Sequence, residues 1–175
     1  MQEKEQKTSS LSKIERLNLA NQYMILSKLD NGMAEEYAMR AQIFERGYTS
    51  LYHVALDDIW DEAADEMQQE VQNILWLHRL MLNTARDLKD PDLSKRVKFY
   101  GFDGNNESGH LGYAHFYCEA PNPNRYTDLQ IRNSHHQTLD RYRLMLNAWR
   151  QMGEPSSLSK QQVEAILSAG TFGGK

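Results

Sequence analysis

Apolar residues recur every three or four positions along most of the chain, the spacing that places them on one face of an α-helix. The longest such pattern runs from Glu62 to Leu88 without a glycine or a proline. At about 1.5 Å per residue, it predicts one central helix of roughly 40 Å. Its acidic start and basic end agree with the helix dipole, which favours carboxylates in the first turn and cations in the last.

Two helices, and a shorter third, are predicted before this segment. Ser12 and Glu15 have the spacing of a capping box, so a first helix should begin there. Its recurring positions are Ile14, Leu17, Asn21, Met24, Ile25 and Leu29. The short link Asp30-Asn31-Gly32 then predicts an antiparallel second helix, which is expected from about Met33 to Arg46 with Gly47 as its stop. A shorter third helix could be capped by Thr49.

Three further helices are predicted in the C-terminal half, at about 106–118, 139–149 and 159–167. Ser159 and Gln162 form a second capping box. Val97, Phe99 and Gly101 alternate with Lys98, Tyr100 and Phe102. This run is too short to distinguish a strand from a helical turn, so an extended or irregular segment is expected. The predicted fold is mainly α: a single-domain helical bundle of about six to seven helices with a long central helix and at most one short extended segment.

Composition narrows the classes of function. The net charge of −4 argues against nucleic acid as a partner, because non-specific affinity for phosphates comes from clustered Lys and Arg. No apolar run approaches the ~20 residues of a membrane helix, and the first ten residues lack the apolar core of a signal peptide. The single Cys118 excludes an internal disulfide. These features predict a cytoplasmic protein without a membrane partner.

The stretch from Phe99 to Tyr113 mixes glycine and asparagine with bulky aromatics and interrupts the helical pattern. Its aromatic half is expected to be structural, and its polar half, from Asp103 to His110, is expected to be exposed. A small-molecule site is therefore predicted here, joined by two residues from another irregular corner. The candidate ligand contacts are Arg46, Tyr48, Asp103, Glu107, His110 and Tyr113. The alternatives are structural: Asp103 caps a turn, Glu107 pairs with Arg46, and the aromatics fill the core.

Glu107 and His110 also permit an enzyme hypothesis. A carboxylate and an imidazole at i and i+3 could act as acid and base, or as metal ligands, in a small hydrolase or metal-dependent enzyme. Di-metal helical bundles need this motif twice, and the chain has no second Glu-x-x-His. The glycines fit neither the Rossmann nor the Walker spacing. No catalytic residue, metal or cofactor is therefore assigned from the sequence.

Several motifs occur together in one order: Glu45-Arg46-Gly47-Tyr48, Phe99-x-Gly101-Phe102-Asp103, Leu111-Gly112-Tyr113-x-x-Phe116 and Tyr142-x-x-Met145-Leu146-Asn147-x-Trp149. In these motifs the chain resembles the YfbU family of uncharacterised bacterial proteins. The resemblance implies a YfbU-like helical domain over residues 11–168. The polar residues 1–10 and the glycine-rich residues 169–175 are expected from their composition to be flexible tails. Members of this family are sometimes joined to helix-turn-helix domains. The function expected from the resemblance is therefore a self-associating, ligand- or partner-binding regulatory module without catalysis.

Overall fold

The computed structural model describes residues 10–120 and 125–171, and within them it contains eight α-helices and one 3-10 helix. The prediction of a mainly α fold is confirmed, with one or two more helices than expected. Most of both predicted tails, and the loop around Asn122, lie outside the described residues. None of the described helices combines the length and the apolar character needed to cross a membrane.

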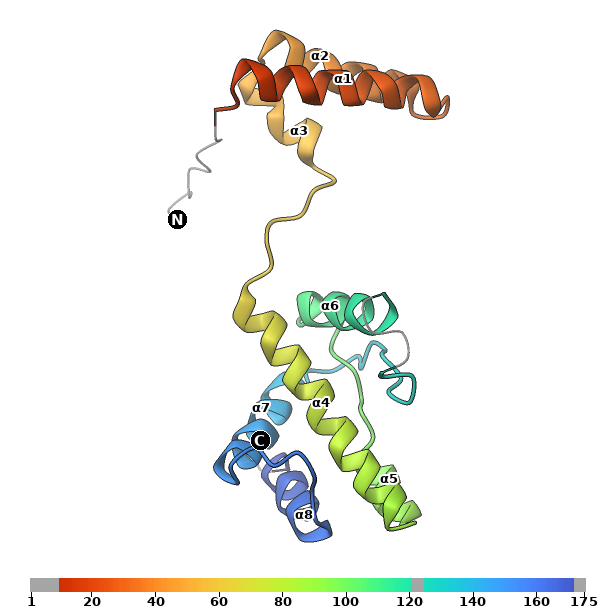
Figure 1. The fold of residues 1–175 in the computed structure, drawn as a ribbon, viewed down its shortest axis with the longest axis vertical. Helices are drawn as coiled ribbons and strands as arrows, with labels where there is room; N and C mark the ends of the chain where they lie inside the picture. Colours follow the sequence, from red (N-terminus) through yellow and green to blue (C-terminus); the bar gives the residue numbers. More distant parts are fainter. Residues whose placement is uncertain (1–9, 121–124, 172–175) are drawn as a thin grey trace. The chain divides into compact units, whose positions relative to one another are not determined.

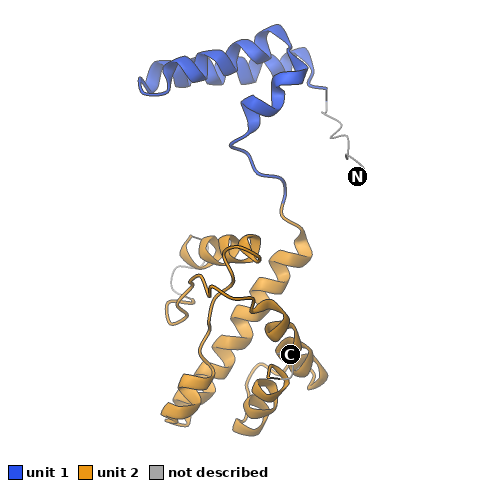
Figure 2. Cartoon of the chain, turned by 180° about the vertical axis from the view of Figure 1, so that it is seen from behind, with its two compact units in different colours: residues 1–62 blue, residues 63–175 orange. Residues whose placement is uncertain are grey.

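The chain forms two compact units, Met1–Glu62 and Ala63–Lys175, which Figure 2 shows in different colours. The first unit contains α1 (Lys13–Leu29), α2 (Ala34–Arg46), the 3-10 helix η1 (Thr49–Leu51) and α3 (Tyr52–Leu56), and α1 lies beside α2 in Figure 1. The predicted capping box at Ser12 and Glu15 is present. Gly47 adopts the left-handed conformation, with φ of 69°, and ends α2 as expected.

The core of the first unit is small and aromatic. The ring of Phe44 is fully buried between Tyr23 and Tyr52, with ring centroids 5.9 and 5.1 Å away. The Tyr23 hydroxyl donates a hydrogen bond to the carbonyl of Ala55, 2.6 Å away, and so ties α1 to α3. The recurring apolar positions of α1 do not take part in this core, because Ile14, Leu17, Met24, Ile25 and Leu29 are all exposed.

The second unit is built around α4 (Asp65–Asp87), the predicted central helix, which is slightly shorter than expected. It packs against α5 (Pro91–Arg96), α6 (Ser108–Glu119), α7 (Leu139–Gln151) and α8 (Lys160–Ala169). The short helix α5 was not predicted. Its signal is local: the Asp90 carboxylate accepts a hydrogen bond from the backbone of Leu93 (2.9 Å), and Pro91 occupies the first turn.

The segment after α5 is irregular, as expected. Phe102 forms an isolated parallel bridge with Asn133, and its amide and carbonyl bond to Arg132 and Ser134 (3.3 and 3.0 Å). Gly101 lies in the left-handed region with φ of 85°, and a Cβ there would collide with the carbonyl of Arg132. The aromatic half of the stretch is structural, because Phe99 and Phe102 pack with His78 and Tyr142 in the core.

Candidate functional site

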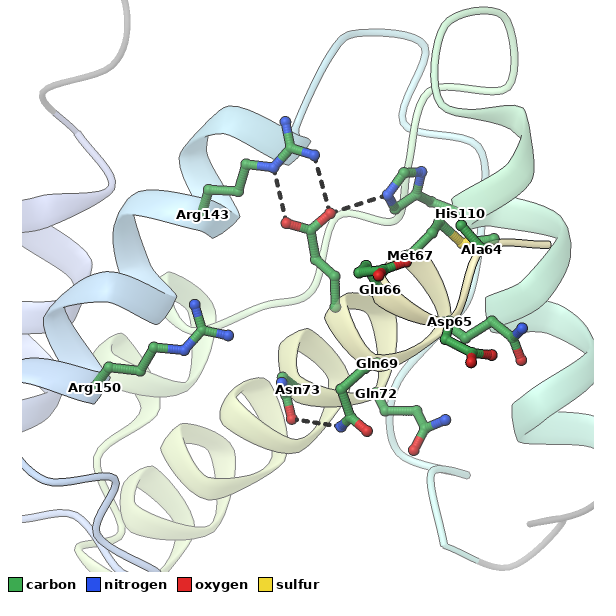
Figure 3. Close-up of a pocket in the computed structure, with 12 residues that line it drawn as sticks. Ala64, Asp65, Glu66, Met67, Gln69, Gln72, Asn73, His110, Arg143 and Arg150 are labelled. Carbon is green, nitrogen blue, oxygen red and sulfur yellow. Dashed lines mark hydrogen bonds and ion pairs between the residues drawn. The ribbon is translucent and has the colours of Figure 1, made fainter.

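The second unit carries a cleft of about 910 Å³ between the start of α4, the first turn of α6 and one face of α7. Figure 3 shows most of its lining side chains. The lining residues from α4 and the residue before it are Ala64, Asp65, Glu66, Met67, Gln68, Gln69, Glu70, Gln72 and Asn73; the others are His110, Arg143 and Arg150. Polar and charged groups of both signs therefore face one open space.

Two side chains, Arg143 and His110, converge on the carboxylate of Glu70. The Arg143 guanidinium donates two hydrogen bonds to the Glu70 carboxylate, from Nε to Oε1 at 2.8 Å and from Nη2 to Oε2 at 3.0 Å. The His110 ring nitrogen Nε2 lies 3.2 Å from Oε2 of the same carboxylate. Figure 3 shows Arg143 and His110 pointing toward this one carboxylate from α7 and α6. We call these three residues the Glu70 node.

The electrostatics of the node favour an ionised carboxylate. Partial burial of Glu70 opposes ionisation, but the hydrogen bonds from Arg143 and then His110 outweigh it and hold the pKa of Glu70 below its ordinary value. The His110 ring also packs against the ring of Phe102, with ring centroids 5.6 Å apart. Contacts with a buried aromatic ring and with a carboxylate therefore fix the position of the imidazole.

Arg150 and the first turn of α4 give the rest of the cleft its charge. Arg150 is about half exposed, and its guanidinium lies 3.8 Å from Glu154, a loose ion pair that leaves it accessible. Ala64 precedes α4 and has no side-chain oxygen, so no side chain of the N-cap residue bonds to the first amides of the helix. Asp65 and Glu66 follow in the first turn and are exposed.

Of the predicted contacts, Glu107 has a structural role instead. Its Oε1 accepts hydrogen bonds from the amides of Thr138 and Leu139, both at 2.8 Å, and its Oε2 accepts one from the amide of Asp103 at 2.8 Å. Glu107 thus caps the start of α7 from the start of α6. The side chain was expected to be exposed and is buried, because these amides need an acceptor away from water.

Asp103 was also expected to be exposed, and this prediction is wrong because Asp103 is buried. Hydrogen bonds from the Asn106 side-chain amide (2.5 Å) and the Asn105 backbone (3.1 Å) hold the pKa of Asp103 below its usual range. The Asp103 carbonyl also accepts from the Glu107 amide at 2.7 Å. Asp103 therefore caps a turn, which is the structural alternative given for it from the sequence.

The remaining candidates lie in different places. His110 lines the cleft, whereas the hydroxyl of Tyr113 accepts a hydrogen bond from Gln72 at 2.7 Å one turn further along α6. Arg46 and Tyr48 belong to the first unit, where the guanidinium lies 3.5 Å from the hydroxyl. One of the six predicted residues, His110, is thus among those that line the cleft of the second unit.

Sequence reasoning missed Glu70 and Arg143. They are 73 positions apart, Glu70 sits among several other acidic residues, and Arg143 lies beside the apolar stripe of its helix. No local motif marks either residue.

The enzyme hypothesis gains no support from the placement of Glu107 and His110. The carboxylate of Glu107 is occupied by backbone amides, and the partner of His110 is Glu70. Burial, with Glu119 nearby, raises the pKa of the Cys118 thiol to about 11, which leaves it protonated at neutral pH. Across residues 10–120 and 125–171, no three His, Cys, Asp or Glu side chains are grouped to hold a metal ion.

Comparison with known proteins gives a family and a relative with an established match. The model of the YfbU domain matches residues 9–169, which includes most of both compact units. The UPF0304 protein MJECS11 of Methanocaldococcus jannaschii is 32% identical over 170 residues, an alignment that covers 91% of this chain and 99% of that protein. This relative is archaeal, so its match does not bear out the prediction of a bacterial source. The compartment stays a prediction.

Proposed function

We propose, from the premise that this chain belongs to the YfbU family, that it is a regulatory module that binds a small polar ligand in the cleft of the second unit and does no chemistry on it. The observation that carries this proposal is the Glu70 node, where α4, α6 and α7 each contribute one ionisable side chain to the same open cleft. Polar groups that converge in a concave site are the usual mark of a binding site.

The charges of the cleft favour a zwitterionic ligand such as a free amino acid or a short peptide. Arg150 offers a guanidinium that is held only by a loose ion pair, and such a group binds carboxylates well. Asp65 and Glu66 offer carboxylates to an ammonium group. A purely anionic ligand would meet these two carboxylates, and a purely cationic ligand would meet Arg150. A ligand with both charges avoids both repulsions.

Regulation would follow from the connections of the node. A ligand carboxylate would compete with Glu70 for Arg143, and a ligand ammonium would compete with Arg143 for Glu70. Either competition changes how α7 is held against α4. Because α6 is joined to the same carboxylate through His110, three helices would respond to one ligand.

Thermal unfolding tests the proposal, with the free L-amino acids and glycylglycine as probes. A ligand present at about 100 times its Kd stabilises the folded state by about 2.7 kcal/mol, which is a rise in Tm of roughly 5 to 10 °C for a chain of this size. The variant Arg150→Gln should lose most of this rise. Arg96→Gln is the matched control, because Arg96 pairs with Glu164 and does not line the cleft.

Two results would contradict the proposal. One is a panel in which no probe raises Tm. The other is a rise that is the same in the native chain and in Arg150→Gln, because binding would then occur elsewhere. Native mass spectrometry of the protein purified from its own host gives a second readout, in which a retained ligand appears as added mass on the 20.4 kDa chain and is lost in Arg150→Gln.

A further inference from the structure

Helix α1 is apolar on two opposite sides, and one side is left uncovered in its own unit. Ala20, Tyr23 and Ser27 face the interior of the unit. At about 100° per residue the opposite side carries a stripe of exposed side chains. The α1 stripe consists of Ile14, Leu17, Asn21, Met24, Ile25, Lys28 and Leu29, and its most exposed apolar members are Leu29 (75%) and Ile14 (73%).

The α1 stripe is arranged symmetrically about Asn21. Leu17 lies four positions before Asn21 and Ile25 four positions after it, while Ile14 lies seven before and Lys28 seven after. If two copies of α1 lie antiparallel with Asn21 against Asn21, then Leu17 of each copy meets Ile25 of the other. A two-fold interface requires such a self-complementary surface, and an asparagine amide can both donate to and accept from its own copy.

The C-terminal half of the stripe borders a shallow groove of about 430 Å³, lined by Asn21, Met24, Ile25, Lys28 and Leu29. Exposed apolar side chains continue into the N-terminal half, where Ile14 is 73% and Leu17 58% exposed. In an antiparallel pair the N-terminal half of each copy lies over the groove of the other.

The charges at the two ends of α1 also favour an antiparallel pair. The first turn carries Lys13 and Glu15, and the other end carries Lys28 and Asp30. An antiparallel pair brings Lys13 near Asp30 and Glu15 near Lys28, whereas a parallel pair places each charge beside its own copy. The parallel arrangement is therefore disfavoured by repulsion.

We propose that the α1 stripe is a homodimer interface in which two copies of α1 pack antiparallel, with Asn21 at the two-fold axis. The stripe offers on the order of 600 Å² of apolar side chain per copy, against the ~800 Å² per partner of a standard interface, and the polar rim supplies the difference. The central Asn21 fixes the register at some cost in stability, as buried asparagines do in helix pairs.

Sedimentation velocity of the native chain at roughly 100 µM should give twice the mass of 20.4 kDa. Leu17→Glu and Ile25→Lys should each raise the dissociation constant at least about 100-fold, because each buries an unpaired charge twice at the interface. The double variant Leu17→Glu with Ile25→Lys should recover much of the affinity, since the new charges face each other in the antiparallel register. Phe116→Glu is the matched control: Phe116 is 65% exposed, lies in the other unit, and should leave the dimer unchanged.

Cysteine crosslinking tests the direction of the helices. In a Cys118→Ser background, Asn21→Cys should form a disulfide-linked dimer on oxidation, because its two copies lie opposite one another. Ile14→Cys should not, because its two copies lie at opposite ends of the pair. A monomeric native chain would overturn the proposal. A dimer unaffected by Leu17→Glu, or one crosslinked by Ile14→Cys, would overturn it equally.

Discussion

Each carboxylate oxygen of Glu107 accepts hydrogen bonds from a different segment of backbone. Replacing Glu107 with glutamine turns one of these acceptors into an NH2 group, which can only donate. Oε1 serves the amides of Thr138 and Leu139, and Oε2 serves the amide of Asp103 and the hydroxyl of Thr138, 3.0 Å away. That hydroxyl has a single proton and also lies 2.8 Å from the carbonyl of Gly101, so it can donate to Gly101 and accept from the new amide group. The amide of Asp103 has no such alternative.

The magnitude follows from this inventory. In Glu107→Gln one buried amide loses its acceptor, which costs about 1 to 3 kcal/mol, and the start of α7 loses a negative charge worth roughly 0.3 to 1 kcal/mol. We therefore expect the free energy of unfolding to fall by about 1 to 4 kcal/mol. Glu107→Ala also removes the acceptor of Thr138 and Leu139, and should cost about 3 to 5 kcal/mol.

Urea unfolding followed by circular dichroism measures both variants. Glu119→Gln, in the last turn of the same helix, is the control and should change stability by less than about 0.5 kcal/mol because Glu119 is exposed. A cost below about 1 kcal/mol for Glu107→Ala would refute the capping role. A stable Glu107→Gln protein that no longer binds ligand would instead establish Glu107 as the ligand contact first predicted from the sequence.

Two further predictions concern the core of the second unit. Burial, with Arg141 nearby, lowers the pKa of His78 from 6.5 to about 4, so the unfolded chain takes up the proton first as pH falls. Stability should drop by roughly 3 kcal/mol from pH ~7 to ~4 in urea unfolding, and a pH dependence that is no shallower in His78→Phe would contradict this. Gly101→Ala should cost more than about 2 kcal/mol in the same assay, whereas Gly112→Ala, with open space around a helical glycine, should stabilise by up to about 1 kcal/mol. Equal effects at the two glycines would mean that the approach of Arg132 is not what requires Gly101.

Local signals predicted the fold well. The capping boxes at Ser12 and Ser159 and the left-handed stop at Gly47 each depend on residues within four positions, so the sequence alone contains them. Helix α5 escaped prediction because its six residues are too few to show a period. The long helix α4 was predicted within three residues at its start and one at its end, because its apolar stripe runs without a breaker.

Long-range pairings could not be predicted in the same way. Glu107 meets Thr138 across 31 positions, and Glu70 meets Arg143 across 73. A periodic pattern also says that a helix has an apolar face without saying what covers it. For α1 that gap matters, because its recurring apolar positions face away from its own core.

The stretch from Phe99 to Tyr113 affects the cleft mostly indirectly, because only His110 of this stretch lines it. Glu107 holds the first amides of α7, and α7 carries Arg143 and Arg150 into the cleft. Three residues later on α6, His110 reaches the carboxylate that Arg143 also binds. The start of α6 therefore sets both the start of α7, the helix that supplies the cations, and the position of the imidazole beside Glu70. A change at Glu107 should reach the ligand through the position of α7, so that weaker ligand binding in Glu107→Gln is expected to accompany its loss of stability.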